Sequence, residues 1–461
     1  MSRPRDFGAK GDGRTDDTAS LQHALEAGDG SLELEAATYL ISRPLVIDLT
    51  KRGPAAVIGR GGTSRIVMAG GGPALRIIGD HGGTADPPSV KPPVWQRQRF
   101  PTVHGLEIVG EHKEAVGIEL TRTMQATISQ VLIRRCKYAI HLVDRARNFL
   151  LADSHLYENS YYGLFAENCN WHQGIIHGNH ISYNQRAGIK MLDGDVHNIQ
   201  ITGNDIEYNR PPRDVKPEDA WPAADVWLEA PKGTISEVTL ASNTIQATIT
   251  PGGANIRIEG LPAAWPKGAR LIAITGNVIG SQEKGIEIRH AIRVTITGNT
   301  IYDSKMLSLD LAHCSGIAVS ANTFAWNGQD TDPPSDGILL TDCENAVLSG
   351  LSVQRPCHGS LDFGGGVTLV RCRDAAVSDC QIIDPQVRGV EVLDCQRCRI
   401  TNNTIVDRRA TPTMREAIRI RGKSRQNLIA HNIVGTPGRK AAKPIDIEPA
   451  MAAELRENLE V

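Results

Sequence analysis

The chain has 461 residues, of which 40% are hydrophobic and 22% charged, and its formal net charge is −2 at pH 7. This balance argues against a general attraction to nucleic acid or an anionic membrane, and no apolar run is long enough to span a bilayer. Aromatic residues make up only 4%, against 45 glycines and 25 prolines. Such a composition favours short strands joined by tight turns over a helical bundle.

The N-terminal segment predicts a strand, a glycine-rich turn and one short helix. In RPRDFGAKGDGRTDDTASLQHALEAG, Thr15 or Asp16 can cap the helix, and Leu21, Ala24 and Leu25 form its apolar side. Because the end of a solenoid needs a cover, we expect this segment to provide it. The first residues lack the apolar stretch of a signal peptide, so we expect a cytoplasmic protein, or a secreted one whose leader is absent from this sequence.

From about residue 115 a short pattern recurs, in which a small or turn residue precedes two apolar residues that flank one variable residue. Alternation with period two indicates short strands, and the spacing of 22 to 37 residues leaves no room for a crossover helix. We therefore expect an all-β fold, a right-handed parallel β-helix of about 13 regular coils. The first apolar residues of the copies are Ile118, Ile140, Leu164, Ile189, Val226, Ile256, Ile286, Leu309, Ile338, Val367, Val390, Ile418 and Ile445.

The repeat predicts a single domain over residues 1–461. We expect a cap with the first coils at 1–75, an insert loop at 76–103, regular coils at 104–450 and a C-terminal end at 451–461.

Turn residues recur between these copies and predict stacked polar ladders. An asparagine that follows TG or a similar pair tolerates a left-handed conformation, and stacked amides can bond from coil to coil. A second ladder is formed by cysteines. The nine cysteines lack zinc-finger spacing, and we interpret them as reduced and mostly structural. The expected ladder residues are Asn179, Asn204, Asn243, Asn277, Asn299, Asn322, Asn403 and Asn432, with Cys169, Cys314, Cys343, Cys372 and Cys395.

The segment DFGAKGDGRTDDTASLQHAL, followed by ATYLISRPLVI, resembles the N-terminal signature of the pectate-lyase-like superfamily of β-helix proteins. That superfamily includes polygalacturonases, rhamnogalacturonases, alginate epimerases and phage tailspikes. The resemblance implies the β-helix fold and a polysaccharide as the class of substrate. The constellation of NTD, paired DD and GHG motifs that marks polygalacturonases is absent, and so is the DPHE motif of alginate epimerases.

A second resemblance concerns the fragment GIEIRHAIRVTITGN, which is similar to the Arg-His strand of chondroitinase-B-like and alginate lyases. Arg289 and His290 match that strand, and the arginine of those lyases serves as the catalytic acid. The position of their lysine base is occupied here by Glu259.

The variable positions of the repeat predict where a site lies. The apolar residues point inward, so two columns of variable residues are expected to face solvent, one residue per coil and about 4.8 Å apart. Carboxylates, bases and aromatic residues concentrate on the middle coils, and the coils from Leu339 to Leu393 are nearly neutral. Long proline-rich segments at 80–102, 209–224 and 261–269 are expected to form cleft walls, and Trp221 and Trp265 lie in two of them.

We expect glycosidic bonds to be cleaved in this groove by paired carboxylates, as in a glycoside hydrolase or a related glycosyl transferase. Crowding of like charges is expected to raise the pKa of one carboxyl group into the range of a general acid. The candidate catalytic residues are Glu229, Glu259, Glu287, Asp310 and Arg289. The candidate substrate-binding residues are Trp227, Arg257, Lys190, His141, Glu167 and His290.

Two alternatives remain open. A polysaccharide lyase would use Lys190 or His141 as its base and Arg289 to neutralise a uronate, with calcium held by Glu229 and Glu259. A non-catalytic, tailspike-like glycan binder is the second alternative. The hydrolase hypothesis needs no metal or other cofactor. The expected partner is an oligo- or polysaccharide, with neither nucleic acid nor membrane involved, and a homotrimer is a possible assembly.

Overall fold

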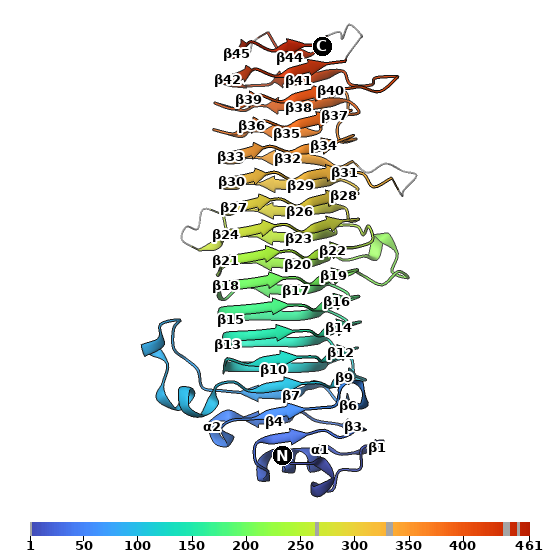
Figure 1. The fold of residues 1–461 in the computed structure, drawn as a ribbon, viewed down its shortest axis with the longest axis vertical. Coiled ribbons are helices and arrows are strands. Elements are labelled where there is room, and N and C mark those ends of the chain that lie inside the picture. The colour runs from blue at the N-terminus through green and yellow to red at the C-terminus, as the bar shows by residue number, and fades with distance from the viewer. Residues whose placement is uncertain (1, 263–266, 329–334, 437–442, 450–451) are drawn as a thin grey trace. The chain divides into compact units, whose positions relative to one another are not determined.

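The computed structural model describes residues 2–262, 267–328, 335–436, 443–449 and 452–461, and the chain divides into two compact units, Met1–Thr239 and Leu240–Val461. Each unit is a parallel β-solenoid whose coils carry three short strands (Figure 1). None of the described helices is long and apolar enough to cross a membrane. The predicted all-β solenoid is confirmed.

The strands of each unit fall into three series. In the first unit, the first series is β4 (Leu45–Asp48), β7 (Gly72–Ile78), β10 (Ala115–Met124), β13 (Tyr138–Ala152), β15 (Tyr162–His177), β17 (Ala187–Leu192) and β20 (Ala224–Glu229). The second is β2 (Ser31–Glu33), β5 (Ala56–Ile58), β8 (Thr102–His104), β11 (Thr127–Ser129), the C-terminal halves of the long strands β13 and β15, β18 (Asp195–Thr202) and β21 (Thr234–Ala241). The third is β1 (Asp12–Asp16), β3 (Ala37–Ile41), β6 (Ser64–Met68), β9 (Glu107–Gly110), β12 (Leu132–Arg134), β14 (His155–Tyr157), β16 (His180–Ser182) and β19 (Asp205–Glu207).

The second unit repeats the plan. Its first series is β23 (Ala254–Glu259), β26 (Lys284–Arg289), β29 (Leu307–Ala312), β32 (Gly337–Thr341), β35 (Val367–Val370), β38 (Arg388–Leu393), β41 (Glu416–Arg421) and β44 (Ile445–Ile447). Its second is β24 (Gly268–Thr275), β27 (Ala291–Thr297), β30 (Ser315–Ser320), β33 (Glu344–Ser349), β36 (Ala376–Ser378), β39 (Arg399–Thr401), β42 (Arg425–Ala430) and β45 (Ala452–Arg456). Its third is β22 (Thr244–Gln246), β25 (Val278–Gly280), β28 (Thr300–Tyr302), β31 (Thr323–Ala325), β34 (Ser352–Gln354), β37 (Gln381–Ile383), β40 (Thr404–Val406), β43 (Ile433–Gly435) and β46 (Leu459–Glu460).

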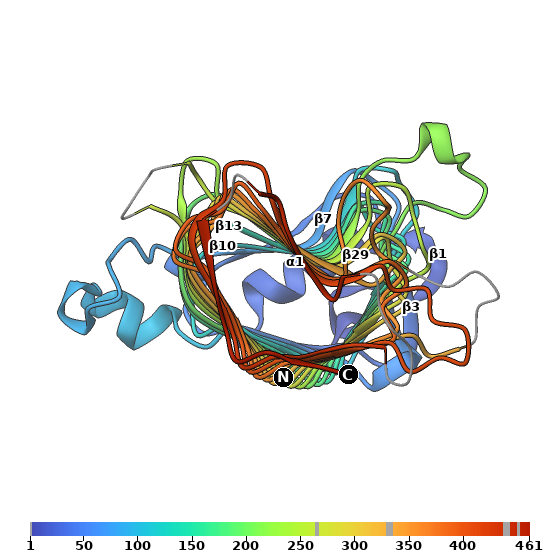
Figure 2. The ribbon, with the colours of Figure 1, turned by 90° about the horizontal axis from the view of Figure 1, so that it is seen from above.

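The coils stack in register, so like residues lie above one another. Ile256 pairs with Ile286, which pairs with Leu309, and all three are fully buried. In a view along the stacking axis, the strands of each unit overlie one another (Figure 2). β4 and β7 pair in the same series as β10 and add two coils before the thirteen that the repeat predicts. β45 and β46 pair with β42 and β43, so residues after 451 continue the coils.

The N-terminal cap contains helix α1 (Thr18–Ala27), together with the short helices α2 (Leu49–Arg52), η1 (Pro4–Phe7) and η2 (Gly61–Thr63). The helix buries Leu21, Ala24 and Leu25, as predicted. The predicted N-cap is wrong, because the cap residue is Asp17. Its carboxylate accepts hydrogen bonds from the backbone N–H groups of residues 10 and 11 rather than from the helix, and so fixes the glycine-rich turn.

The insert between β7 and β8 spans 79–101 and contains η3 (Pro87–Ser89) and the π-helix η4 (Val94–Gln98). Its Val90 and Val94 pack against Met124 of β10. Nη1 of Arg147 donates a hydrogen bond to the carbonyl oxygen of Thr84, 3.0 Å away. The insert is therefore attached to the outer surface of its own unit by apolar and polar contacts. The segment from β19 to β20 contains η5 (Pro217–Asp219).

The predicted asparagine ladder is confirmed within both units. Oδ1 of Asn299 accepts from the side chain of Asn277, and Nδ2 of Asn299 donates to Oδ1 of Asn322, each over 2.9 Å. The left-handed conformation, however, belongs to the residue before each asparagine, as at Gly298 and Ala321, whose φ angles are 65° and 51°. The asparagine turns inward instead and satisfies the backbone at the corner.

The predicted stacking of cysteines is confirmed for Cys314, Cys343, Cys372 and Cys395, whereas Cys169 is buried in the first unit with no cysteine on the coils beside it. All nine cysteines are free, and Cys314, Cys343, Cys372 and Cys395 are buried. Sγ of Cys395 accepts a hydrogen bond from the backbone N–H of Cys372, 3.3 Å away on the preceding coil. These cysteines are therefore small buried residues that pack at one corner of successive coils.

Replacing Asn299 by Ala is expected to lower the free energy of unfolding by about 2–4 kcal/mol, because the buried N–H of Asn277 and the buried carbonyl oxygen of Ile274 lose their side-chain partner. The exposed Thr300 is the matched control, and its replacement by Ala is expected to change stability by less than about 0.5 kcal/mol. Urea unfolding of both variants checks this. Equal losses would mean that the ladder contributes nothing beyond an ordinary surface position.

Asp336 occupies a buried corner of the second unit, and its titration should make the stability of the fold depend on pH. Its Oδ1 accepts from the backbone N–H of Ser304 and the hydroxyl of Ser308, over 2.8 and 3.0 Å. Burial raises the pKa of Asp336 to about 7. Since the folded protein holds this proton more tightly than the unfolded chain, stability falls as pH rises from about 4 to about 7.

The variant Asp336→Asn should remove this dependence, because an amide keeps the acceptor oxygen without a titrating proton. We expect it to be more stable than the natural protein at pH 8, by an amount on the order of 2–4 kcal/mol, and to differ little at pH 4. Thermal unfolding at the two pH values measures the difference. A gain of the same size at both would exclude the titration of Asp336 as its cause.

Candidate functional site

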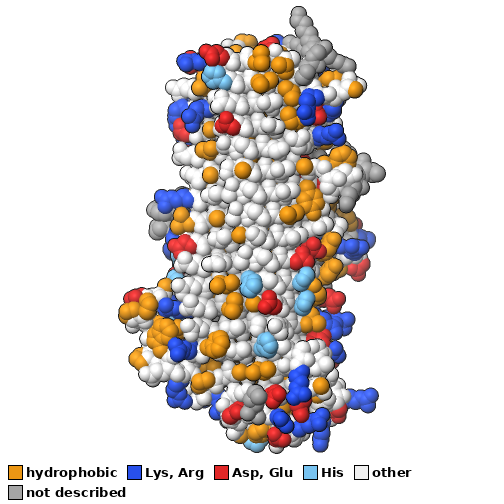
Figure 3. Space-filling model, in the orientation of Figure 1, with side chains coloured by type: hydrophobic (Ala, Val, Ile, Leu, Met, Phe, Trp, Pro, Cys, Tyr) orange, Lys and Arg blue, Asp and Glu red, His pale blue; other side chains and the backbone are white. Residues whose placement is uncertain are grey.

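The outward positions of the first strands carry charge, whereas the third strands of the second unit before β46 do not. From β22 to β43, the third strands contain no charged residue. Figure 3 shows a face on which, over the coils of the second unit, charged side chains lie near the edges and are almost absent from the middle. Charge on this solenoid is therefore placed selectively, and the first-strand face is a candidate site.

The first column of variable residues was expected to face solvent, and this expectation is wrong. These side chains point away from the core, yet Lys190 is 3% exposed, Asp310 5% and Glu287 8%. Each packs against the next residue of its column, because paired residues on neighbouring coils lie one above another. The second column, which includes Glu167, is partly exposed.

In the first unit, His141 lies between two carboxylates. Its Nε2 is 3.2 Å from Oε2 of Glu167, and its Nδ1 is 3.7 Å from Oε2 of Glu119. The imidazole stacks on the ring of Phe165, with centroids 5.2 Å apart and planes inclined by 4°. The ring is thus fixed by neighbours on both sides, and the predicted grouping of His141 with Glu167 is found.

Lys190, Trp227 and Glu229 form a second group in the first unit. The Lys190 ammonium lies 3.6 Å from the ring centroid of Trp227 and forms an ion pair with Glu229. Trp227 was expected to project outward for sugar stacking, but it is half-buried because the lysine covers its ring. Glu229 is engaged by a cation, which disfavours its predicted role as a calcium ligand. Glu259 belongs to the second unit, so the expected pair of Glu229 and Glu259 stays a prediction.

In the second unit, Glu287 and Asp310 lie on adjacent coils among three cations. Nη2 of Arg289 is 3.2 Å from Oε1 of Glu287 and 2.5 Å from Oδ2 of Asp310. Those two oxygens are therefore at most about 5.7 Å apart. Lys284 also contacts both carboxylates, and Nε of Arg257 is 2.7 Å from Oε2 of Glu287. The predicted grouping of Arg257, Glu287, Arg289 and Asp310 is found, and Lys284 joins it.

The electrostatics of this group differ from the expectation. Burial raises the pKa of Glu287, but Arg257 and Lys284 outweigh it, so the pKa lies below its usual value. Burial lowers the pKa of Arg289, but the hydrogen bond and charge of Asp310 outweigh it and raise the value. The predicted rise of a carboxyl pKa is thus wrong for Glu287, because cations rather than like charges dominate its surroundings.

His290 lies apart from this group. It occupies the left-handed corner after β26, with φ 54°, and its ring stacks on His313 of the next coil at 4.8 Å. Burial, His313 and Arg289 lower its pKa. Of the predicted wall residues, Trp221 donates its indole N–H to the carbonyl oxygen of Gln185, and Trp265 lies outside the described residues.

Sequence reasoning missed a third charged group, beneath the insert of the first unit. Arg145 and Arg147 are 7% and 5% exposed, and His81 is 1% exposed. Among the described residues, Nε and Nη2 of Arg145 and both ring nitrogens of His81 are buried without a hydrogen-bond partner. Burial and the charges of Arg145 and Arg147 lower the pKa of His81 to about 4. The sequence signal for this group is a polar-apolar-polar triplet that recurs on three successive coils. Its copies are RAR at 145–147, NWH at 170–172 and DVH at 195–197.

The buried charge of Arg145 generates a stability prediction. Arg145→Met keeps the volume and removes a desolvated cation, so we expect the free energy of unfolding to stay the same or rise by about 1–4 kcal/mol. The exposed Arg397, which pairs with Asp374 at 2.7 Å, is the control, and its replacement by Met should change stability by less than about 1 kcal/mol. Chemical denaturation measures both. A clear loss for Arg145→Met would show that this guanidinium contributes net favourable contacts.

The fold and the stacked corners define the class of this protein as a parallel β-solenoid. The chain belongs to the family described as the right handed beta helix region, whose sequence model matches residues 107–245 and 265–434, more than half of the chain. The predicted membership in the right-handed β-helix proteins of the pectate-lyase-like superfamily is confirmed by this match to the coils. No curated protein matches the sequence.

Solved structures align with this chain at low sequence identity. The tailspike gp61 of Pseudomonas phage phi297 aligns with a TM-score of 0.52 and 12% identity over 98% of this chain and 83% of its own. The mannuronan C-5 epimerase AlgE6 A-module of Azotobacter vinelandii aligns with a TM-score of 0.35 and 14% identity over 100% and 99%. Bacteriophage CBA120 tailspike protein 3 aligns with a TM-score of 0.41 and 12% identity over 99% of this chain, which spans 61% of that protein. These likenesses concern the fold alone.

Proposed function

We propose that this protein is a carbohydrate-active enzyme that cleaves glycosidic bonds of an oligo- or polysaccharide on the first-strand face of the second unit. The observation that carries the proposal is the pair Glu287 and Asp310, two buried carboxylates on adjacent coils whose nearest oxygens are at most about 5.7 Å apart. A separation of roughly 5–5.5 Å is typical of retaining glycosidases, and inverting enzymes need about 6.5–9.5 Å. The geometry therefore favours retention.

The surroundings of the two carboxylates suggest different roles. Glu287 stays ionised because its pKa is lowered, which suits a nucleophile that attacks the anomeric carbon. Asp310 is then the proton donor to the leaving oxygen. Lys284 contacts both carboxylates, so a sugar that displaces this ammonium would gain access to Glu287 and Asp310 together. In this proposal Arg257 and Arg289 orient Glu287 and bind polar groups of the sugar.

A polysaccharide lyase is the second candidate, and the cluster of three cations favours it. Arg257, Lys284 and Arg289 all contact Glu287, and cations so placed suit the carboxylate of a uronate. The bases first considered for this reaction, Lys190 and His141, belong to the first unit and are engaged by Glu229 and Glu167. Lys284 is the base that lies beside Arg289.

Mass spectrometry of the products from neutral and uronate-containing oligosaccharides distinguishes the candidates. Hydrolysis adds one water to the fragments, whereas elimination leaves a new double bond that absorbs ultraviolet light. We expect Glu287→Gln and Asp310→Asn to lower kcat by about 10²–10⁴-fold. Glu344→Gln, which removes an exposed partner of Arg373, is the control and should keep full activity.

A loss of activity through misfolding is separated from a catalytic loss by chemical rescue. In Glu287→Ala, added azide should restore cleavage and form a glycosyl azide of inverted configuration, because a small anion replaces the missing nucleophile. Full activity in Glu287→Gln would overturn the assignment of this residue. If no saccharide is cleaved but one is retained, the protein is a glycan binder and the enzymatic proposal is wrong.

A further inference from the structure

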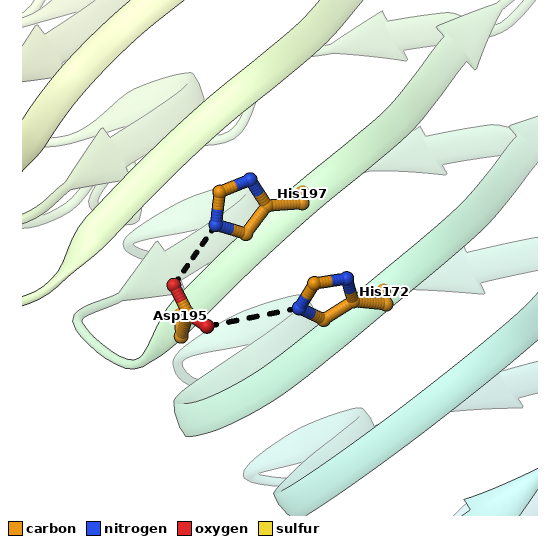
Figure 4. A group of neighbouring side chains, drawn as sticks. All are labelled: His172, Asp195 and His197. Atoms are coloured by element: carbon orange, nitrogen blue, oxygen red, sulfur yellow. Dashed lines mark hydrogen bonds and ion pairs between the residues drawn. The ribbon is translucent and has the colours of Figure 1, made fainter. Parts of the chain in front are cut away.

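Three potential metal ligands meet on the outer surface of the first unit, away from the first-strand face. His172 lies on β15, and Asp195 and His197 lie on β18. His172 pairs directly with His197 in the parallel register, so the two imidazoles project from neighbouring coils in the same direction. Asp195 comes from the adjacent column of the same short strand. Figure 4 shows its carboxylate turned toward both rings.

The distances fit a single small cation. Nε2 of His197 is 2.9 Å from Oδ1 of Asp195, and Nε2 of His172 is 3.7 Å from Oδ2 of the same carboxylate. One ligand atom of each residue lies within 4.8 Å of the other two. A tetrahedral zinc ion with bonds of about 2.0–2.1 Å separates its ligand atoms by about 3.3 Å. The two measured contacts bracket that value, so small side-chain rotations would complete the coordination.

The surroundings fix the rings in a manner common at metal sites. Nδ1 of His197 lies 3.6 Å from Oε2 of Glu237, and a carboxylate behind a histidine orients the ring and strengthens it as a ligand. The two imidazoles stack with centroids 4.9 Å apart and an angle of 25°. Nδ1 of His172 is buried without a hydrogen-bond partner, which leaves Nε2 as the nitrogen that faces Asp195.

We propose that His172, Asp195 and His197 bind a divalent transition-metal ion of the zinc class, with at least one coordination position open to solvent. The side chain of Asp195 is 50% exposed, and those of His172 and His197 are 15% and 16% exposed, so an ion can enter from the surface. Three protein ligands leave a fourth position for water or an external ligand. This site is separate from the proposed glycosidic site and does not depend on it.

The charges around the site favour zinc over calcium or magnesium. Two of the three ligands are imidazoles, which suit zinc, copper and nickel, whereas calcium and magnesium prefer oxygen. The buried Arg145 adds a positive charge near Asp195 and His172. This charge lowers the affinity for ions such as calcium and magnesium, whose binding depends mainly on electrostatic attraction. The same charge favours an anion, such as a carboxylate, in the open position of a bound metal.

Titration of the full chain with Zn²⁺ after removal of metals tests the proposal. We expect one equivalent to bind, and we expect His172→Gln, His197→Gln and Asp195→Asn each to weaken binding by at least about 100-fold. Glu237→Gln should weaken it by about 10- to 100-fold, since this residue acts through His197. Co²⁺ in place of zinc should give visible absorption bands of a four-coordinate ion, which the ligand variants lose.

The matched control is His180→Gln, which removes another stacked histidine of the same unit. His180 lies 3.0 Å from Asp205 and stacks on His155 at 5.2 Å, but it belongs to no group of three ligands among the described residues. This variant should bind zinc like the natural protein, and zinc should raise the Tm of both. The absence of stoichiometric binding, or equal loss in His180→Gln, would overturn the proposal. So would unchanged binding in His172→Gln or His197→Gln.

Discussion

The structure depends on one constraint, the in-register stacking of short parallel strands. Because side chains alternate along a strand, each coil sends one set inward and the other outward, and register places every residue over its counterpart. Ile256, Ile286 and Leu309 form a buried column for this reason, and Arg257, Glu287 and Asp310 form a charged column beside it. Core and candidate site are thus two consequences of the same hydrogen-bonded geometry.

The corners determine how far this geometry extends. A left-handed residue such as Gly298 turns the chain, and the asparagine after it carries the backbone hydrogen bonds from one coil to the next. Segments of different length leave the solenoid between such corners without disturbing the strands. The insert at 79–101 is one example, and it is attached by the packing of Val90 and Val94 on Met124 and by the hydrogen bond from Arg147 to the carbonyl oxygen of Thr84.

Much of the fold could be predicted from sequence because its signals are local. The apolar pairs of each coil and the asparagines that follow turn residues report strand and corner directly, so the series of coils and both ladders were found. The predicted N-cap of α1 was one to two residues too early. The cap residue is Asp17, whose carboxylate bonds to the preceding turn, and the helix begins at the next residue, Thr18.

The candidate site was predictable only in part. The pattern identified which residues share a column, so Glu287, Asp310, Arg257 and Arg289 were grouped correctly. It could not reveal that these side chains are buried or that Lys284 bridges the carboxylates, because both depend on packing between coils.

The second strands hid the remaining groups from sequence analysis. His172 and His197 each occupy the third position of a polar-apolar-polar triplet, and so short a triplet does not by itself show which coils it belongs to. Only the register of β15 and β18 brings the two histidines together.

The ladder has a consequence for how such a chain changes length. Asn299 bonds to the coil before it and to the coil after it. Loss of part of this coil would break both junctions, whereas loss of the entire coil would leave Asn277 facing Asn322. Heritable changes in length should therefore accumulate as whole coils or as segments between corners, and the solenoid can be lengthened or shortened by recombination without redesign of its core.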